Sequence, residues 1–170
     1  MELETLLDGN SSRNMVDAAV DIVLAQPAKR KELIELALTD NQPMAWHACW
    51  VMNHAADKDK SVFQSAIPQL IEFLPKVTSE SQKREILRTI SKHIIPEDYE
   101  VQIYDYCLEM MKSKKEAIGI KGHCLVILKK MVKKYPDLND EVKLTLTEIL
   151  PYIESTGLRF QIKRDFKIAK

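Results

Sequence analysis

Glycine and aromatic residues are scarce in this sequence. The 170 residues include 4 glycines, and Phe, Trp and Tyr together make up 6%. Sheet proteins with many tight turns and folds that bind phosphate through glycine-rich loops both depend on glycine, so its scarcity argues against them. There is also no excess charge, because 25 basic residues balance 25 acidic ones. The overall charge therefore does not demand nucleic acid, a membrane surface or another polyanion as a partner.

Long hydrophobic runs are absent and cysteines are few. No stretch approaches the roughly 18 apolar residues that predict a membrane span, and the opening residues, MELETLLD, are too acidic and interrupted for a secretory signal. Cys49, Cys107 and Cys124 are odd in number and lie in apolar helical patterns. We expect a cytoplasmic protein with buried free thiols and no membrane contact.

Apolar side chains recur at intervals of three and four residues along most of the chain, which is the spacing of amphipathic helices. No alternating run is long enough to predict a strand. Pro68 lies inside one helical pattern and is expected to kink or break that helix. With prolines, serines and polar segments as boundaries, the sequence predicts eight helices and a short ninth: 13–25, 28–39, 43–56, 61–75, 80–94, 97–111, 115–134, 138–153 and 158–168.

Parts of the chain resemble each other at a shift of 76 residues. His47 then falls on His123, and Pro75 falls on Pro151. A unit of about 70–76 residues corresponds to two helical hairpins, each near the period of helical-hairpin repeats. Because one hairpin cannot bury its apolar face alone, neighbouring hairpins are expected to stack into a solenoid.

This pattern resembles the HEAT-like and armadillo-like helical repeat proteins over nearly the whole chain. The resemblance lies in the order and spacing of helices rather than in a motif. It implies an all-α fold, a right-handed α-α superhelix of about four antiparallel helical hairpins, as a single domain over residues 1–170. A stack of hairpins presents an extended surface to a partner. The resemblance therefore implies a non-catalytic protein-interaction or scaffold module, with an unidentified protein as its partner.

The predicted helix over 43–56 carries the most distinctive side chains. Trp46 and Trp50 are four residues apart and share a stripe beside small apolar residues. Two interpretations stay open. Either the tryptophans pack within a central, mostly buried helix, or they anchor a partner, because tryptophan is enriched at binding hot spots. The candidate partner-binding residues are Trp46, Trp50, His47 and His54.

Catalytic signatures and metal-binding spacings are not found in the sequence. His47 and His54 are two helical turns apart, whereas two ligands of one zinc ion usually lie one turn apart. No C-x-x-C pair occurs, and no nucleophile elbow or Ser–His–Asp arrangement is recognisable. We predict that the protein is not an enzyme and holds no cofactor or metal.

Basic residues concentrate in the second half of the chain. Residues 1–80 carry a net charge of −5 and residues 81–170 a net charge of +5. Seven lysines form a candidate basic patch: Lys114, Lys115, Lys121, Lys129, Lys130, Lys133 and Lys134. Either their stems cover apolar surface on a solvated face, or they bind phosphate, as HEAT-like DNA-binding proteins do. Nucleic acid is thus the alternative to a protein partner, and the choice between monomer and homodimer stays open.

Overall fold

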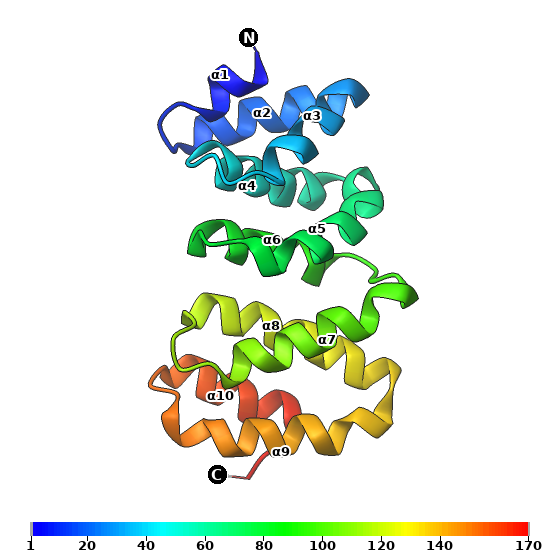
Figure 1. Ribbon diagram of the computed structural model, residues 1–170, viewed down its shortest axis with the longest axis vertical. Coiled ribbons are helices and arrows are strands. Elements are labelled where there is room, and N and C mark those ends of the chain that lie inside the picture. The colour runs from blue at the N-terminus through cyan, green and yellow to red at the C-terminus, as the bar shows by residue number, and fades with distance from the viewer. Residues whose placement is uncertain (1, 170) are drawn as a thin grey trace. The chain divides into compact units, whose positions relative to one another are not determined.

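The computed structural model describes residues 2–169, which form ten α-helices and four 3-10 helices without any strand (Figure 1). The α-helices are α1 (Leu3–Leu7), α2 (Arg13–Ala25), α3 (Pro27–Ala37), α4 (Met44–Lys58), α5 (Ile67–Phe73), α6 (Glu80–Lys92), α7 (Glu97–Lys112), α8 (Ile118–Lys134), α9 (Asn139–Ile149) and α10 (Thr156–Phe166). The 3-10 helices are η1 (Lys60–Ala66), η2 (Leu74–Lys76), η3 (Pro136–Leu138) and η4 (Leu150–Tyr152). The all-α prediction is confirmed.

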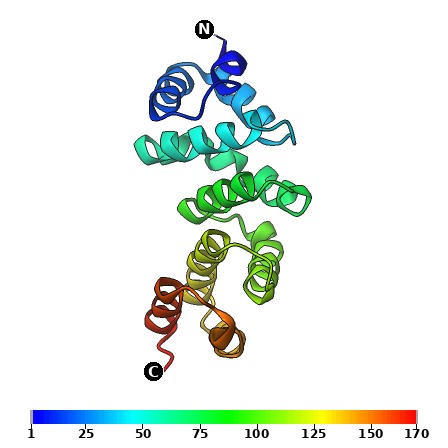
Figure 2. The same ribbon diagram turned by 90° about the vertical axis from the view of Figure 1, so that its left-hand side faces the viewer.

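The chain divides into two compact units, Met1–Pro96 and Glu97–Lys170, which we call the N-terminal unit and the C-terminal unit. Within the N-terminal unit, α2, α4 and α6 form one layer, and α1, α3 and α5 form the other (Figure 2). Within the C-terminal unit, α8 and α10 form one layer, and α7 and α9 form the other. Each layer takes alternate helices because successive helices pair as antiparallel hairpins. The prediction of a single domain over residues 1–170 stays a prediction.

Local sequence signals explain where several helices begin and end. α2 covers the predicted range and begins after Ser12, whose hydroxyl accepts a hydrogen bond from the Met15 amide. The predicted helix over 61–75 is divided into η1 and α5 at Ile67, where Pro68 occupies the first turn of α5. A proline costs no backbone hydrogen bond there, so the expected break at Pro68 is confirmed.

The internal repeat is visible in the helix caps. α5 and α9 are each followed by a Leu-Pro 3-10 turn, η2 and η4. After each turn a serine caps the next helix. Ser79 accepts from the Gln82 amide before α6, and Ser155 accepts from the Leu158 amide before α10. Because these serines are also 76 residues apart, α3–α6 and α7–α10 follow one plan.

Polar side chains inside the N-terminal unit fix how its helices meet. Asn53 of α4 donates to the carboxylate of Glu85 on α6 at 2.6 Å. Gln82 of α6 donates to the carbonyls of Ala37 and Thr39 at 2.9 and 2.8 Å. A buried polar group left without its partner costs about 1–3 kcal/mol, so these bonds disfavour any other register of α6 against α3 and α4.

Gly122 provides a test of helix packing in the C-terminal unit. It lies within α8, and a Cβ added there meets no atom within 4 Å. Glycine in a helix interior is about 0.5–1 kcal/mol less favourable than alanine. We therefore predict that Gly122→Ala raises the free energy of unfolding by about that amount, measured by urea denaturation.

Gly9→Ala is the control, because its added Cβ would lie 3.3 Å from the Leu6 carbonyl oxygen. This variant should gain no stability. Equal gains for both variants would contradict the explanation from helix-interior propensity.

Candidate functional site

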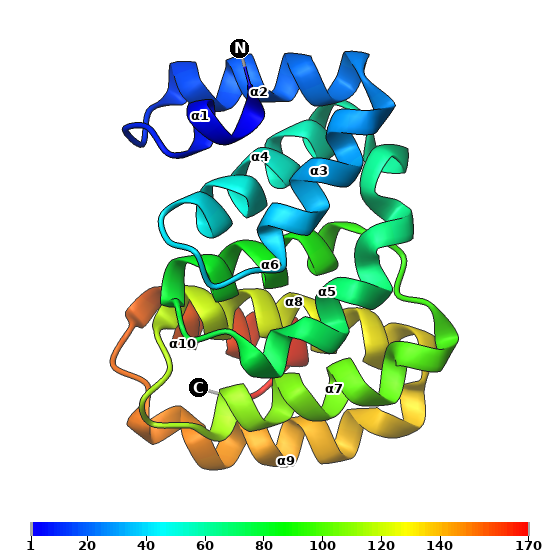
Figure 3. The same ribbon diagram turned by 45° about the horizontal axis from the view of Figure 1, so that its top comes forward.

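α4 is the central helix of the N-terminal unit, between α2 and α6 in its own layer and against α3 in the other (Figure 3). Most of its side chains are buried. Small residues on the buried faces allow neighbouring helices to approach closely: Ala45, Ala48, Cys49, Ala55 and Ala56. One stripe of the helix stays partly accessible to solvent, and it carries large aromatic side chains.

Trp46, Trp50 and His54 form this stripe, which we call the aromatic row. Their spacing of four residues places them on successive turns of α4. The Trp46 and Trp50 rings stack with their centroids 5.4 Å apart and their planes 20° apart. His54 meets Trp50 edge-on at a centroid distance of 6.0 Å. All three side chains are partly exposed, so the tryptophans are neither core residues nor freely solvated.

His47, the remaining histidine of α4, lies in the core. It is fully buried, with Nδ1 2.6 Å from the Leu7 carbonyl oxygen and Nε2 2.6 Å from Ser11 Oγ. A carbonyl only accepts hydrogen bonds, so Nδ1 carries the proton and Nε2 accepts from the Ser11 hydroxyl. His47 thus ties α1 and the loop after it to α4. Its role is structural rather than the partner contact that the sequence suggested.

The neighbouring helix α6 carries a second set of side chains, Arg84, Arg88 and Lys92, which we call the basic row; the charges of Arg88 and Lys92 act on His54. Lys92 donates to Asp57 of α4 at 2.7 Å, so the two helices are joined at this end. Arg84 and Arg88 lie 3.6 and 4.0 Å from the single carboxylate of Glu85. Because two guanidinium groups share one carboxylate, this surface retains positive charge that a ligand can neutralise.

Arg13 of α2 lies on the other side of the aromatic row. Its Nη1 is 3.4 Å from both ring nitrogens of His54, and its Nε donates to Asp17 at 3.0 Å. Burial lowers the pKa of His54, and the charges of Arg13 and Arg88 lower it further. The imidazole is therefore neutral at neutral pH, and the cationic character of the surface comes from the arginines.

The sequence did not single out these arginines as site residues. Arg13 is isolated in the sequence, and only the packing of α2 on α4 brings it to His54. The sequence does contain a signal for the basic row, because basic residues recur every four positions at 84, 88 and 92. That spacing predicts a shared helix face, but it does not show that Arg88 and Lys92 lie near His54.

Two lysines of the predicted basic patch are occupied in intramolecular contacts. Lys121 is buried and donates to the carbonyls of Met111 and Ser113 at 3.1 and 2.5 Å. Lys134 donates to Glu100 Oε1 at 2.7 Å. Lys121 therefore leaves the exposed face of α8, whereas Lys134 stays on that face with its charge paired to Glu100.

The other five lysines occupy different parts of the C-terminal unit. Lys114 lies over the Tyr152 ring, 4.8 Å from its centroid, and Lys115 is exposed between α7 and α8. Lys129, Lys130 and Lys133 are exposed on α8, as is Lys134. Lys129 is 3.2 Å from Asp165 of α10. The structure therefore leaves four of the seven lysines exposed on α8, and two of these four, Lys129 and Lys134, are paired with acidic side chains.

Residues 2–169 contain no group of three or more His, Cys, Asp or Glu side chains that could hold a metal ion. The three cysteines are free and buried. Over the same range, every helix is too short or too polar to cross a bilayer.

Comparison with known families agrees with the stacked hairpins. The family model of a HEAT repeat domain matches residues 3–168. The chain belongs to the HEAT repeat domain family. No curated protein and no solved structure matches it. The HEAT repeat match spans both units and confirms the resemblance inferred from the order of helices.

The bond between Ser11 and His47 can be tested by mutation. Ser11→Ala leaves the buried Nε2 acceptor without its hydroxyl donor, which costs about 1–3 kcal/mol. We expect a loss of unfolding free energy in this range, measured by urea denaturation. Ser65→Ala, at an exposed serine of the same unit, should change stability by less than about 0.5 kcal/mol. Similar losses in both variants would contradict the assigned role of His47.

The Lys134–Glu100 pair predicts a pH-dependent stability. Burial raises the pKa of the Glu100 carboxyl, but hydrogen bonds from Lys134 and Tyr135 outweigh it, so that the pKa lies below its usual value. A carboxyl group whose pKa falls on folding stabilises the fold above its unfolded pKa, about 4.3. This contribution disappears as the pH falls through the lower folded value.

We therefore expect Lys134→Gln to lower the unfolding free energy at pH 7 and to have a smaller effect at pH 2, because the stabilisation by the Glu100 carboxylate is lost as the pH falls toward and through its lowered folded pKa. Urea denaturation at the two pH values measures the difference. Lys133→Gln, at the neighbouring exposed lysine, is the matched control. An equal effect of Lys134→Gln at both pH values would show that Glu100 is not its partner in stability.

Proposed function

We propose that this HEAT repeat chain is a non-catalytic protein-interaction module and that the aromatic row and the basic row together form its contact surface in the N-terminal unit. The observation that carries the proposal is the stacked pair of Trp46 and Trp50, which stays partly exposed beside arginines that share one carboxylate. Tryptophan and arginine are the residue types most enriched at binding hot spots.

The internal repeat supports a functional rather than a structural reason for the tryptophans. At a shift of 76 residues, Trp46 and Trp50 correspond to Gly122 and Val126 of α8. The same helix position in the same fold thus accepts a residue without a side chain, and a Cβ at Gly122 would meet no atom. Large aromatic side chains are therefore not a requirement of hairpin stacking at these positions.

The geometry of the row is suited to a partner with apolar and acidic side chains. The two indoles hold each other in place, so little side-chain entropy is lost when a partner covers them. Arginine donates through a planar fork that matches a carboxylate, and Arg84 and Arg88 are each more than a third exposed. We infer a protein segment that places an apolar side chain on the indoles and a carboxylate at these arginines.

The alternative of nucleic-acid binding rested on the lysine patch. With Lys121 buried and Lys134 paired with Glu100, the observation that favoured this alternative is weakened. Binding to nucleic acid is therefore an outcome of the tests below rather than a second proposal.

Fluorescence tests the exposure of the aromatic row, because both tryptophans of the chain belong to it. We expect acrylamide to quench the emission of the free protein partially, and a bound partner to reduce the Stern–Volmer slope. Quenching that is absent in the free protein would place both indoles in the core and remove them as anchors.

Affinity capture with tagged full-length protein tests the contact surface. We expect Trp50→Ala to retain at most a tenth of the partner that the unchanged protein captures, because the variant removes a central apolar anchor. Phe160→Ala is the matched control, since Phe160 is an exposed aromatic residue of α10 in the other unit. Helical content and the midpoint of thermal unfolding verify that both variants fold. Equal capture by all three proteins, or capture of nucleic acid alone, would contradict the proposal.

A further inference from the structure

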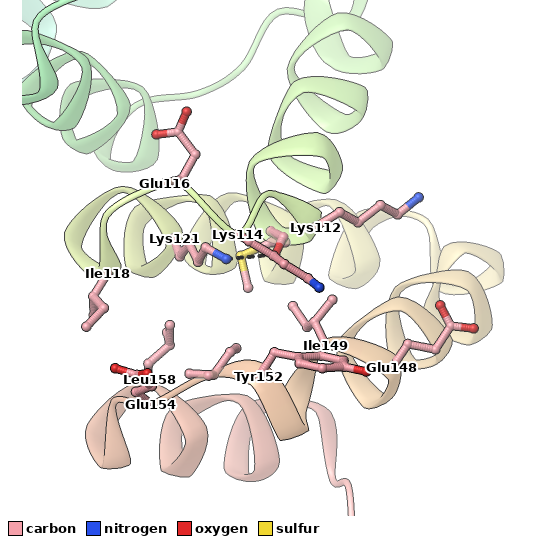
Figure 4. Close-up of a pocket in the computed structure, with 12 residues that line it drawn as sticks. Lys112, Lys114, Glu116, Ile118, Lys121, Glu148, Ile149, Tyr152, Glu154 and Leu158 are labelled. Atoms are coloured by element: carbon pink, nitrogen blue, oxygen red, sulfur yellow. Dashed lines mark hydrogen bonds between the residues drawn. The ribbon is translucent and has the colours of Figure 1, made fainter.

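The C-terminal unit contains a pocket of about 480 Å³ that the aromatic row does not involve. It lies where the end of α7, the start of α8 and the turn from α9 through η4 to α10 meet (Figure 4). Its volume is within the range of small-ligand sites. Half of the lining is apolar and comes from Tyr152 and five aliphatic side chains, Met111, Ile118, Ile149, Ile153 and Leu158, while the other half is three lysines and three glutamates.

Two amino groups face this aliphatic space. Lys121 and Lys114 extend their amines toward the centre of the pocket, above Tyr152 and Ile149 (Figure 4). The Lys121 ammonium has three N–H groups and uses two of them on the carbonyls at the end of α7. The third N–H is the donor that a ligand oxygen would use. Lys114, over the Tyr152 ring, supplies a second cation.

Carboxylates lie at the edge of the pocket rather than at its centre. Glu116, Glu148 and Glu154 also line it, but their carboxylates are at the periphery of the view, away from the two amines (Figure 4). The site thus has hydrogen-bond donors inside and acceptors outside. A ligand that matches it carries an anion at one end and N–H donors farther out.

The mouth of the pocket is apolar and uncovered. Ile118 is 54% exposed and Tyr152 is 69% exposed. Exposed apolar groups around a hollow with cations mark a surface for a ligand rather than a solvated face.

We propose that this pocket binds the carboxyl-terminal residue of a partner protein, with its apolar side chain against the aliphatic walls and its α-carboxylate at Lys121 and Lys114. This site is separate from the aromatic row and goes beyond the proposed function. In a C-terminal residue the carboxylate and the side chain leave the same Cα, which matches amines that lie directly beside aliphatic walls. The preceding peptide N–H groups are then available to the edge carboxylates.

Other carboxylates fit less well. An internal Asp or Glu side chain brings the anion but no apolar group from the same residue. A fatty acid brings both, but its long chain would lie across the open mouth next to Ile118 and Tyr152 with much of its surface in water.

The test is a titration of ¹⁵N-labelled full-length protein with the peptide N-acetyl-Gly-Ser-Ala-Leu, followed by amide chemical shifts. We expect shifts at Ile118, Tyr152 and Leu158 and no shifts at Trp46 or Trp50. Amidation of the peptide's carboxyl terminus should weaken binding at least tenfold, because it removes the charge that the two lysines recognise. Replacing the final leucine with serine should weaken binding by a similar factor.

Matched variants locate the site. Ile118→Asp places a negative charge at the mouth and should abolish binding, whereas Leu144→Asp, at an exposed leucine of α9 outside the pocket, should not change it. Lys114→Gln should weaken binding several-fold, and Lys133→Gln should not. Lys121 is left unchanged because it caps the end of α7.

Three results would overturn the proposal: equal binding of the amidated peptide, tighter binding of decanoate than of the peptide, or no shifts at 5 mM peptide. Trp50→Ala is expected to bind the peptide like the unchanged protein. Failure of the aromatic row as a contact surface is therefore distinguishable from failure of this pocket.

Discussion

The fold depends on each helical hairpin covering the apolar face that its neighbour leaves open. α4 shows this dependence most clearly, since it contacts α2, α3 and α6 and has small residues where those helices approach. A helix enclosed on three sides has one accessible stripe left, and in α4 that stripe carries Trp46, Trp50 and His54. The same packing that stabilises the N-terminal unit therefore fixes the position of its candidate site.

Buried hydrogen bonds then determine which side chains surround the site. Asn53 and Glu85 join α4 to α6, and in this register Arg88 lies close enough to His54 for its charge to lower the pKa of the imidazole. On the other side, His47 holds the loop before α2 through Ser11, close to where Arg13 begins the helix and reaches His54. Polar groups in the core thus act on function indirectly, because a change of register would separate the indoles from the arginines.

Sequence periodicity predicts features that depend on residues close in the sequence. It fails for features that are determined by contacts between helices. The range of α2 and the break at Pro68 follow from caps and a proline. α1 is absent from the prediction because five residues are too few to show a period. Lys121 and Lys134 belong to one lysine-rich segment, yet they point to different neighbours, since a helix distributes adjacent residues over all its faces. Which face is buried is set by the neighbouring helices.

The repeat explains how one chain can carry two sites of different character. In a stack of hairpins, each hairpin contacts only its neighbours, so exposed positions can vary without disturbing the layers. The position that holds Trp46 in α4 holds Gly122 in α8, and the lysine-lined pocket of α8 has no aromatic row beside it. Surface chemistry can therefore diverge between repeats while caps such as Ser79 and Ser155 keep the helices in register. A substitution at one site should accordingly leave binding at the other unchanged.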